Sequence, residues 1–218
     1  MARAFTPLAV LAMLLFAIAP FYVASAPDEQ TMGLIQRVFY YHVPSAMLLF
    51  LSAFVCGIGS AVFLFKRSAA ADRVAVAAGE LAVAFGLIVL ITGPMWARKA
   101  WGVWWQWDAR LTSSLLLWMM FVAYLLVRRY GGPGSEKLSA AMAIFGMANV
   151  PFVYVSVNFW RTIHPNTNVV MTLGSGMRGP FWFCAASFLL LYVLLLTLRR
   201  RLEEQRASVE QLYLALDD

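Results

Sequence analysis

Six stretches of the chain are apolar over enough residues to cross a lipid bilayer as helices. An α-helix needs about 20 apolar residues to span the hydrocarbon core. Of the 218 residues, 62% are hydrophobic and 13% are charged. A soluble domain usually has about 45–50% apolar residues and about 25% charged residues. This composition excludes a disordered chain, a secreted disulfide scaffold and an ordinary cytosolic enzyme. We predict an all-α integral membrane protein, a bundle of six transmembrane helices over 7–26, 43–65, 74–95, 111–127, 138–157 and 181–198.

The first of these stretches has some features of a secretory signal peptide. Arg3 precedes an apolar run that ends in Ala-Ser-Ala at 24–26, as in a cleavable leader. The run is longer than the core of a usual signal peptide, and Pro27 would directly follow the cut. We therefore expect the first span to be retained.

The basic residues are divided unevenly between the two sides of the expected membrane. Eleven of the 17 Lys and Arg lie on the side of the termini, and six lie in the loops 27–42, 96–110 and 158–180. Because Lys and Arg are enriched in cytoplasmic loops, we expect both termini in the cytoplasm and these three loops outside. The net charge of +6 is then a signal of topology, and we expect no nucleic-acid partner. We expect a membrane domain over 1–198 and a short charged cytoplasmic helix over 199–218.

Tryptophan is concentrated on the expected outer side, which holds seven of the eight residues of this type. An aromatic belt would occupy both membrane interfaces, so the cluster favours a platform for a flat aromatic ligand. If 101–108 is helical, Trp107 points into lipid and the segment lies along the interface. The remaining members of the motif would then share one face of that helix, namely Trp101, Trp104, Trp105 and Asp108.

The two histidines of the chain, His42 and His164, flank this Trp-rich segment on the same side. Two imidazoles without thiolate ligands, beside a planar aromatic platform, suit haem iron. Zinc suits them less, because a structural zinc site usually has four ligands. We expect Cys56 and Cys184 to be small buried residues, since no motif for covalent haem attachment is present. The cations available to haem propionates are Arg37, Arg98, Lys99, Arg110, Arg161 and Arg178.

The sequence WGVWWQWDARLTS at 101–113 resembles the tryptophan-rich WWD signature of the haem-handling proteins of cytochrome c maturation. Within that group, the short chain, six spans and flanking histidines resemble the CcmC family. The segments 41–44 and 160–164 are similar to its two histidine motifs. The resemblance extends from about residue 30 to residue 198, and the tail beyond is not covered. Residues 97–100, Ala-Arg-Lys-Ala, are more basic than we would expect of the family, which leaves the edge of the platform open.

This resemblance implies a haem-delivery role in c-type cytochrome biogenesis rather than an enzyme activity. Haem b would bind at the periplasmic face of the bacterial inner membrane, with His42 and His164 as axial ligands of the iron. The signature would supply the platform, with Arg110 among the cations near the propionates and Trp101, Trp104, Trp105, Trp107 and Asp108 around the ring. CcmE would receive the haem with help from CcmD, and the ATP-binding-cassette subunits CcmA and CcmB would complete the complex.

Three other functions agree with part of the sequence. A b-type cytochrome would keep its haem for electron transfer, although such proteins tend to hold their histidines within the bundle. A haem exporter would need polar groups through the spans, where we expect Glu80 to snorkel or to pair with Arg73. We expect Asn149 to make a hydrogen bond between helices. An assembly scaffold could dock the ATPase through the basic loops 66–73 and 128–137.

Overall fold

The computed structural model describes the backbone of residues 2–217 and the side chains of 5–209, 211–213 and 215–216. The side chain of Arg3, one of the inner charges, lies outside this description. The described chain contains six α-helices and one short 3-10 helix. Each of the six α-helices is long and apolar enough to span a membrane. This confirms the predicted fold class. In chain order the elements are α1 (Ala2–Ala24), η1 (Leu34–Val38), α2 (Phe39–Lys66), α3 (Ala69–Trp101), α4 (Ala109–Tyr130), α5 (Ser135–Phe159) and α6 (Ser175–Asp217).

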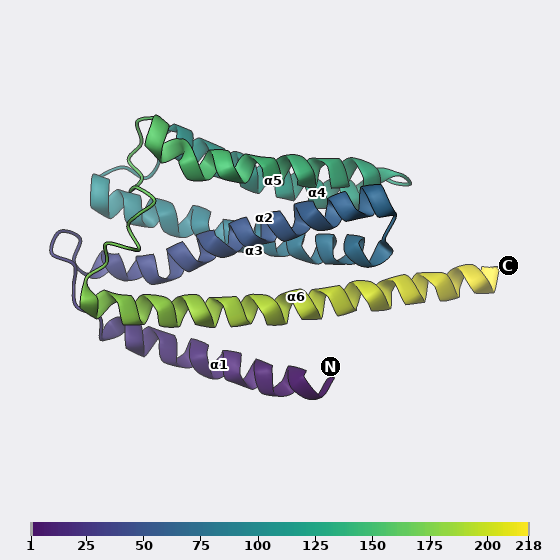
Figure 1. Cartoon of the computed structure of the whole chain (residues 1–218), viewed down its shortest axis with the longest axis horizontal. Coiled ribbons are helices and arrows are strands. Elements are labelled where there is room, and N and C mark those ends of the chain that lie inside the picture. Colours follow the sequence, from purple (N-terminus) through teal and green to yellow (C-terminus); the bar gives the residue numbers. More distant parts are fainter. Residues whose placement is uncertain (1, 218) are drawn as a thin grey trace.

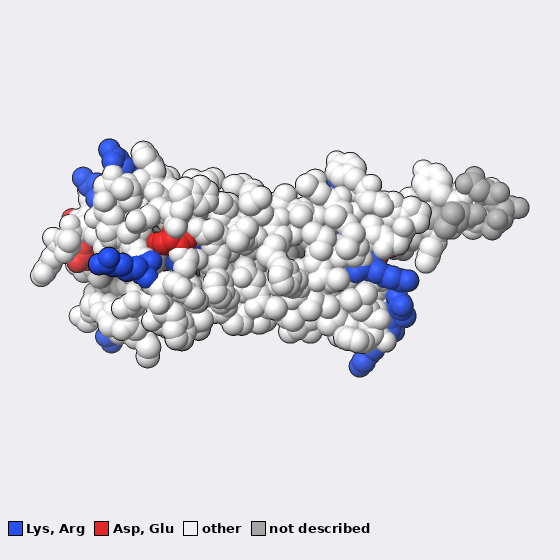
Figure 2. All heavy atoms as spheres, turned by 90° about the horizontal axis from the view of Figure 1, so that it is seen from above, with Lys and Arg blue, Asp and Glu red and all other residues white. Residues whose placement is uncertain are grey.

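The six helices run side by side along the long axis of the molecule (Figure 1). Helix α2 packs along α3 and α5, α5 packs along α4, and α6 lies against α2 and α3 with α1 on its far side. The two chain ends point to the same end of the bundle, as six crossings require. The opposite end carries η1, the segment 102–108 and the irregular segment 160–174 (Figure 1). On the face in Figure 2, Lys and Arg gather at the two ends and the middle is uncharged.

Most helices extend beyond the predicted apolar cores, because capping residues rather than hydropathy set their ends. Helix α3 begins where the Ser68 hydroxyl accepts from the backbone N–H of Ala71. It ends at Trp101, and the next residue, Gly102, has a φ of 78°, a left-handed conformation that favours glycine. The predicted tail helix over 199–218 is the unbroken continuation of α6 as far as Asp217.

Small residues let the spans approach closely. A Cβ at Gly57 of α2 would lie 2.5 Å from the Cβ of Met147 on α5, so only glycine fits this helix crossing. Membrane helix interfaces are enriched in such residues because tight packing replaces the hydrophobic driving force between helices. Cys56 and Cys184 are free and fully buried in the two packed cores, as expected.

Two polar groups of the spans have partners on other helices. Asn149 donates to the carbonyl of Ser113 at 3.4 Å, which confirms the predicted interhelical bond. The expected pairing of Glu80 with Arg73 is wrong, because Glu80 forms its ion pair with Arg199 of α6. Arg73 and Glu80 are seven residues apart on α3, about 10 Å along the helix, so they do not meet.

Candidate functional site: a pocket between two histidines

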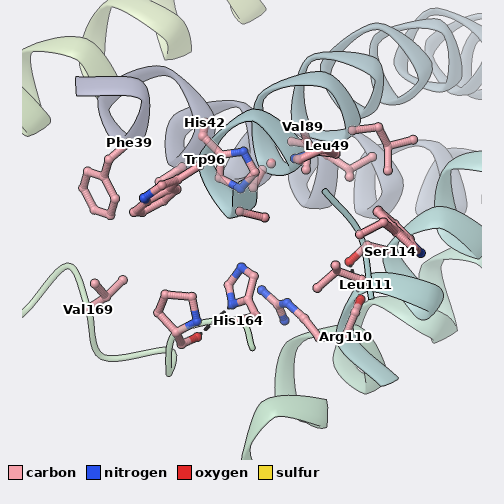
Figure 3. Close-up of a pocket in the computed structure, with 18 of the residues that line it drawn as sticks. Phe39, His42, Leu49, Val89, Trp96, Arg110, Leu111, Ser114, His164 and Val169 are labelled. Carbon is pink, nitrogen blue, oxygen red and sulfur yellow. Dashed lines mark hydrogen bonds between the residues drawn. The ribbon is translucent and has the colours of Figure 1, made fainter. Parts of the chain in front are cut away.

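An apolar pocket lies at the end of the bundle opposite the chain termini. Its walls come from α2, α3, α4 and the segment 160–174. The cavity contains about 850 Å³ of space, part of it open to solvent, within the roughly 300–1,000 Å³ typical of small-molecule and cofactor sites. His42 and His164, which are far apart in the sequence, face each other across it (Figure 3). The structure therefore brings the two predicted ligands to one cavity.

His42 lies in the first turn of α2 and is buried. Its Nδ1 is 2.8 Å from the Thr92 hydroxyl, which donates its own proton to the Ile88 carbonyl at 2.7 Å. Because the hydroxyl has only one proton, it accepts a hydrogen bond from His42, and the network assigns the imidazole proton to Nδ1. The Nε2 lone pair is left free, as metal ligation by a neutral imidazole requires.

His164 shows the same assignment with a different partner. Its Nδ1 lies 2.8 Å from the Pro165 carbonyl oxygen, which can only accept, so Nδ1 carries the proton. Burial lowers the pKa of His164 to about 4, and the positive charge of nearby Arg110 adds to this effect. The ring is therefore neutral at pH 7, with Nε2 free.

Asp108 does not line the pocket; it fastens the segment that carries His164. One carboxylate oxygen accepts from the Leu111 backbone N–H at 2.8 Å and caps α4. The other accepts from the Thr162 hydroxyl at 2.6 Å and from the Ile163 N–H at 3.1 Å. The Thr162 oxygen in turn accepts from the His164 N–H at 3.0 Å. Asp108 therefore orients the loop that carries His164. We call the two hydrogen bonds from Thr162 and Ile163 to Asp108 the latch.

The Trp-rich segment is not the helix that we considered. Helix α3 ends at Trp101 and α4 begins after Asp108, so 102–108 is irregular and the four residues share no helical face. Trp101 and Trp105 line the pocket. Trp104 and Trp107 lie outside it, 58% and 75% exposed. Two of the four predicted platform tryptophans thus reach the cavity.

Arg110 lines the pocket from the first turn of α4 and is buried. One of its guanidinium nitrogens donates to the Val153 carbonyl, and the group lies 5.9 Å from the centre of the Phe50 ring. A guanidinium has five N–H donors, so several are left for an anionic ligand. The buried Nε1–H of Trp105 has no partner among the described residues, which adds a further donor on this pocket.

The other expected outer cations are at the periphery. The guanidinium of Arg37 is 3.3 Å from the Asp28 carboxylate, while Arg98 and Arg178 donate to the carbonyls of Gly102 and Leu173. None of them lines the pocket between the histidines. Arg110 is thus the one of the predicted propionate-binding cations that reaches this cavity.

Comparison with known proteins identifies the family of the chain. The family model described as Heme exporter protein C, CcmC, matches residues 1–214. The chain belongs to the CcmC family. A protein of Bradyrhizobium diazoefficiens named Heme exporter protein C is 34% identical over 217 residues, covering 97% of this chain and 82% of that protein. Its namesake in Escherichia coli K12 is 31% identical over 204 residues, 87% of this chain and 80% of that protein.

The chain is also similar to a mitochondrial protein. A putative cytochrome c biosynthesis ccmC-like mitochondrial protein of Marchantia polymorpha is 30% identical over 169 residues, 76% of this chain and 72% of that protein. The CcmC family consists of membrane subunits that handle haem for cytochrome c maturation, in a system that includes ATP-binding-cassette subunits.

In this CcmC protein, the sequence reasoning missed the residues of α3 that hold His42. Trp96 was assigned to the outer loop, yet it is buried on α3, with its ring 6.0 Å from the His42 ring in an edge-on arrangement. Thr92 and Gly93 lie one turn earlier on the same helix and also contact His42. The spacing of four residues between Thr92 and Trp96 was the available signal, and it required α3 to continue past its apolar core.

Proposed function

We propose that this protein holds haem b at the periplasmic face of the bacterial inner membrane and delivers it to the haem chaperone CcmE. His42 and His164 are the axial ligands of the iron. The observation that carries the proposal is the pair of facing imidazoles, each with Nδ1 bonded to an acceptor and Nε2 free. Two neutral imidazoles and no thiolate suit a six-coordinate haem iron.

The walls of the pocket suit the remainder of the haem. Trp96, Trp101 and Trp105 offer large aromatic surfaces beside the two histidines, and they bury a flat ring well. The propionates need cationic or N–H donors in the same cavity. Arg110, with donors to spare, and the Nε1–H of Trp105 supply them. Three residues of the signature lie outside the pocket in this proposal, namely Trp104, Trp107 and Asp108. Asp108 acts through its hydrogen bonds to the segment that carries His164.

Delivery requires that one ligand can leave. His42 is fixed in a helix, whereas His164 lies in an irregular segment that is fastened by side-chain hydrogen bonds to Asp108. Segments without regular secondary structure open at lower free-energy cost than packed helices. Release of the 160–174 segment therefore exposes the bound haem to CcmE, while His42 remains in place.

The orientation and partners follow from the distribution of charge. The end of the molecule with the chain termini carries most of the Lys and Arg, so we assign it to the cytoplasm and the pocket to the periplasm. Arg67, Arg129 and Lys137 are exposed at that end. They suit docking of the ATP-binding-cassette subunits CcmA and CcmB, with CcmD as a further partner. Any ATPase activity belongs to those partners.

Two alternative functions agree less well with the spans. An exporter needs a polar route, but the described ionisable groups Glu80 and Arg199 are paired, and Asn149 bonds to its neighbouring helix. An electron-transfer cytochrome keeps its haem, so it does not need an iron ligand in an irregular segment that can be released. Entry of haem sideways from lipid is compatible with the proposal.

The test is haem binding and transfer by purified protein. We expect wild-type protein to give a bis-imidazole visible spectrum and to lose haem to apo-CcmE. His42→Ala and His164→Ala should each abolish that spectrum, while His164→Ala still folds because the segment is held through Asp108. An unchanged spectrum in both variants would disprove the ligand assignment, and full haem retention with apo-CcmE would favour electron transfer.

A further inference from the structure

Three residues of helix α3 lie against the His42 imidazole. Thr92 contacts its Nδ1, Trp96 lies edge-on to the ring, and Gly93 lies beside its Cε1 atom. A Cβ at Gly93 would come within 3.2 Å of the His42 Cε1 atom, so the ring occupies the space that this glycine leaves. The ring is therefore positioned by a helix other than its own.

We propose that Thr92 is a positioning residue for His42, whose hydroxyl keeps the imidazole proton on Nδ1 and directs Nε2 into the pocket. This inference rests on the proposed haem-binding function. Its basis is the direction of the hydrogen bonds: the Thr92 proton goes to the Ile88 carbonyl at 2.7 Å, so the hydroxyl oxygen can only accept from His42. A neutral imidazole with its proton on Nε2 could not bind iron there.

The two histidines differ in this respect. His164 bonds to a backbone carbonyl, which no side-chain substitution removes, whereas the acceptor for His42 is a side chain. The hydrogen bond also makes the imidazole a stronger electron donor, and loss of such outer partners typically weakens metal binding about 10–100-fold. Thr92 thus affects both the affinity for haem and the reduction potential of its iron.

The test compares Thr92→Val, which keeps the shape and removes the hydroxyl, with Thr92→Ser, which keeps the hydroxyl. Haemin is titrated into each purified full-length protein, and the midpoint potential is then measured. We expect Thr92→Val to bind haem about 10–100-fold more weakly and to have a higher midpoint potential. Thr92→Ser should resemble wild type. Thr92→Ala replaces the valine variant if that one is not recovered from membranes.

Two controls separate positioning from general stability. Thr197→Val removes the same kind of hydroxyl-to-carbonyl bond, to Val193 at 2.7 Å on α6, away from any histidine, and should leave both quantities unchanged. In a His42→Ala background, Thr92→Val should have no further effect on affinity. The inference is overturned if Thr92→Val has the same haem affinity and midpoint potential as Thr92→Ser. It is also overturned if Thr92→Val weakens haem binding by the same factor in the His42→Ala background. If wild type shows no bis-imidazole spectrum, the proposed function itself fails, and the inference fails with it.

Discussion

The latch at Asp108 can be tested by substitutions that remove its two functions separately. Asp108 caps α4 through Leu111 and holds the His164 segment through Thr162 and Ile163. Asparagine is an equally good N-cap. Its amide can accept on only one side, so Asp108→Asn that keeps the cap directs an N–H₂ group at the Ile163 N–H. Asp108→Asn therefore loses the Ile163 bond and the negative charge that the Thr162 hydroxyl meets, while its N–H₂ group donates to the Thr162 oxygen and the cap is kept. Asp108→Ala removes the latch and the cap.

The size of the effect follows from the hydrogen bonds that are lost. Bonds to charged groups contribute about 1.5–3 kcal/mol each, and we take about 1 kcal/mol each because Asp108 is only half-buried. One lost bond and one that is no longer charge-assisted, together about 1.5 kcal/mol, shift the balance between latched and open segment by a factor of about 10. Because His164 must stay in place to bind the iron, we expect haem affinity to fall in Asp108→Asn by up to about 10-fold, the full factor applying when the open segment predominates.

The assay is a haemin titration followed by Soret absorbance, with thermal unfolding in detergent measured on the same samples. Asp108→Asn should lose affinity with little change in unfolding temperature, and Asp108→Ala should lose both. Ser68→Ala removes an N-cap from α3 at the other end of the molecule and should affect only stability. The latch interpretation is refuted if Asp108→Asn binds haem as wild type does, or if its loss of affinity is matched by Ser68→Ala.

Three further outcomes are expected. Trp105→Ala should weaken haem binding more than Trp104→Ala in the same titration, because only Trp105 lines the pocket; equal losses would contradict this. Asp72→Asn should lower stability by roughly 3 kcal/mol, because it breaks a bidentate ion pair with Arg128 at 2.7 and 2.5 Å in which both side chains are only 16% exposed. Exchanging the two residues should restore part of the loss in chemical unfolding, and a swap as unstable as the single variant would refute the pairing. Gly57→Ala should cost roughly 1–3 kcal/mol by overpacking, and unchanged thermal unfolding would show that the crossing can adjust.

The features predicted correctly from the sequence depend on composition over many residues. The six spans follow from hydropathy, and the common side of the two histidines follows from their places between spans. Motifs of four to thirteen residues around His42, Trp105 and His164 identified the family. These features can be predicted from the sequence because each signal is repeated along the chain or is long enough to be specific.

The features that were missed depend on contacts between segments distant in the sequence. Glu80 meets Arg199, which is 119 residues away. No local periodicity encodes such pairs. The assumed helix over 101–108 failed for a local reason, since Gly102 ends one helix and Asp108 begins the next.

The length of α6 has a mechanical consequence. At about 1.5 Å per residue, its 43 residues reach about 65 Å, roughly twice the thickness of a bilayer core. The helix begins directly after the segment that carries His164 and continues past the other helices at the end with the chain termini (Figure 1). An unbroken helix transmits axial displacement and rotation along its length. A partner that pulls or turns its far end therefore exerts force on the segment beside the pocket, so mechanical work done on one side of the membrane reaches the other through a single rod.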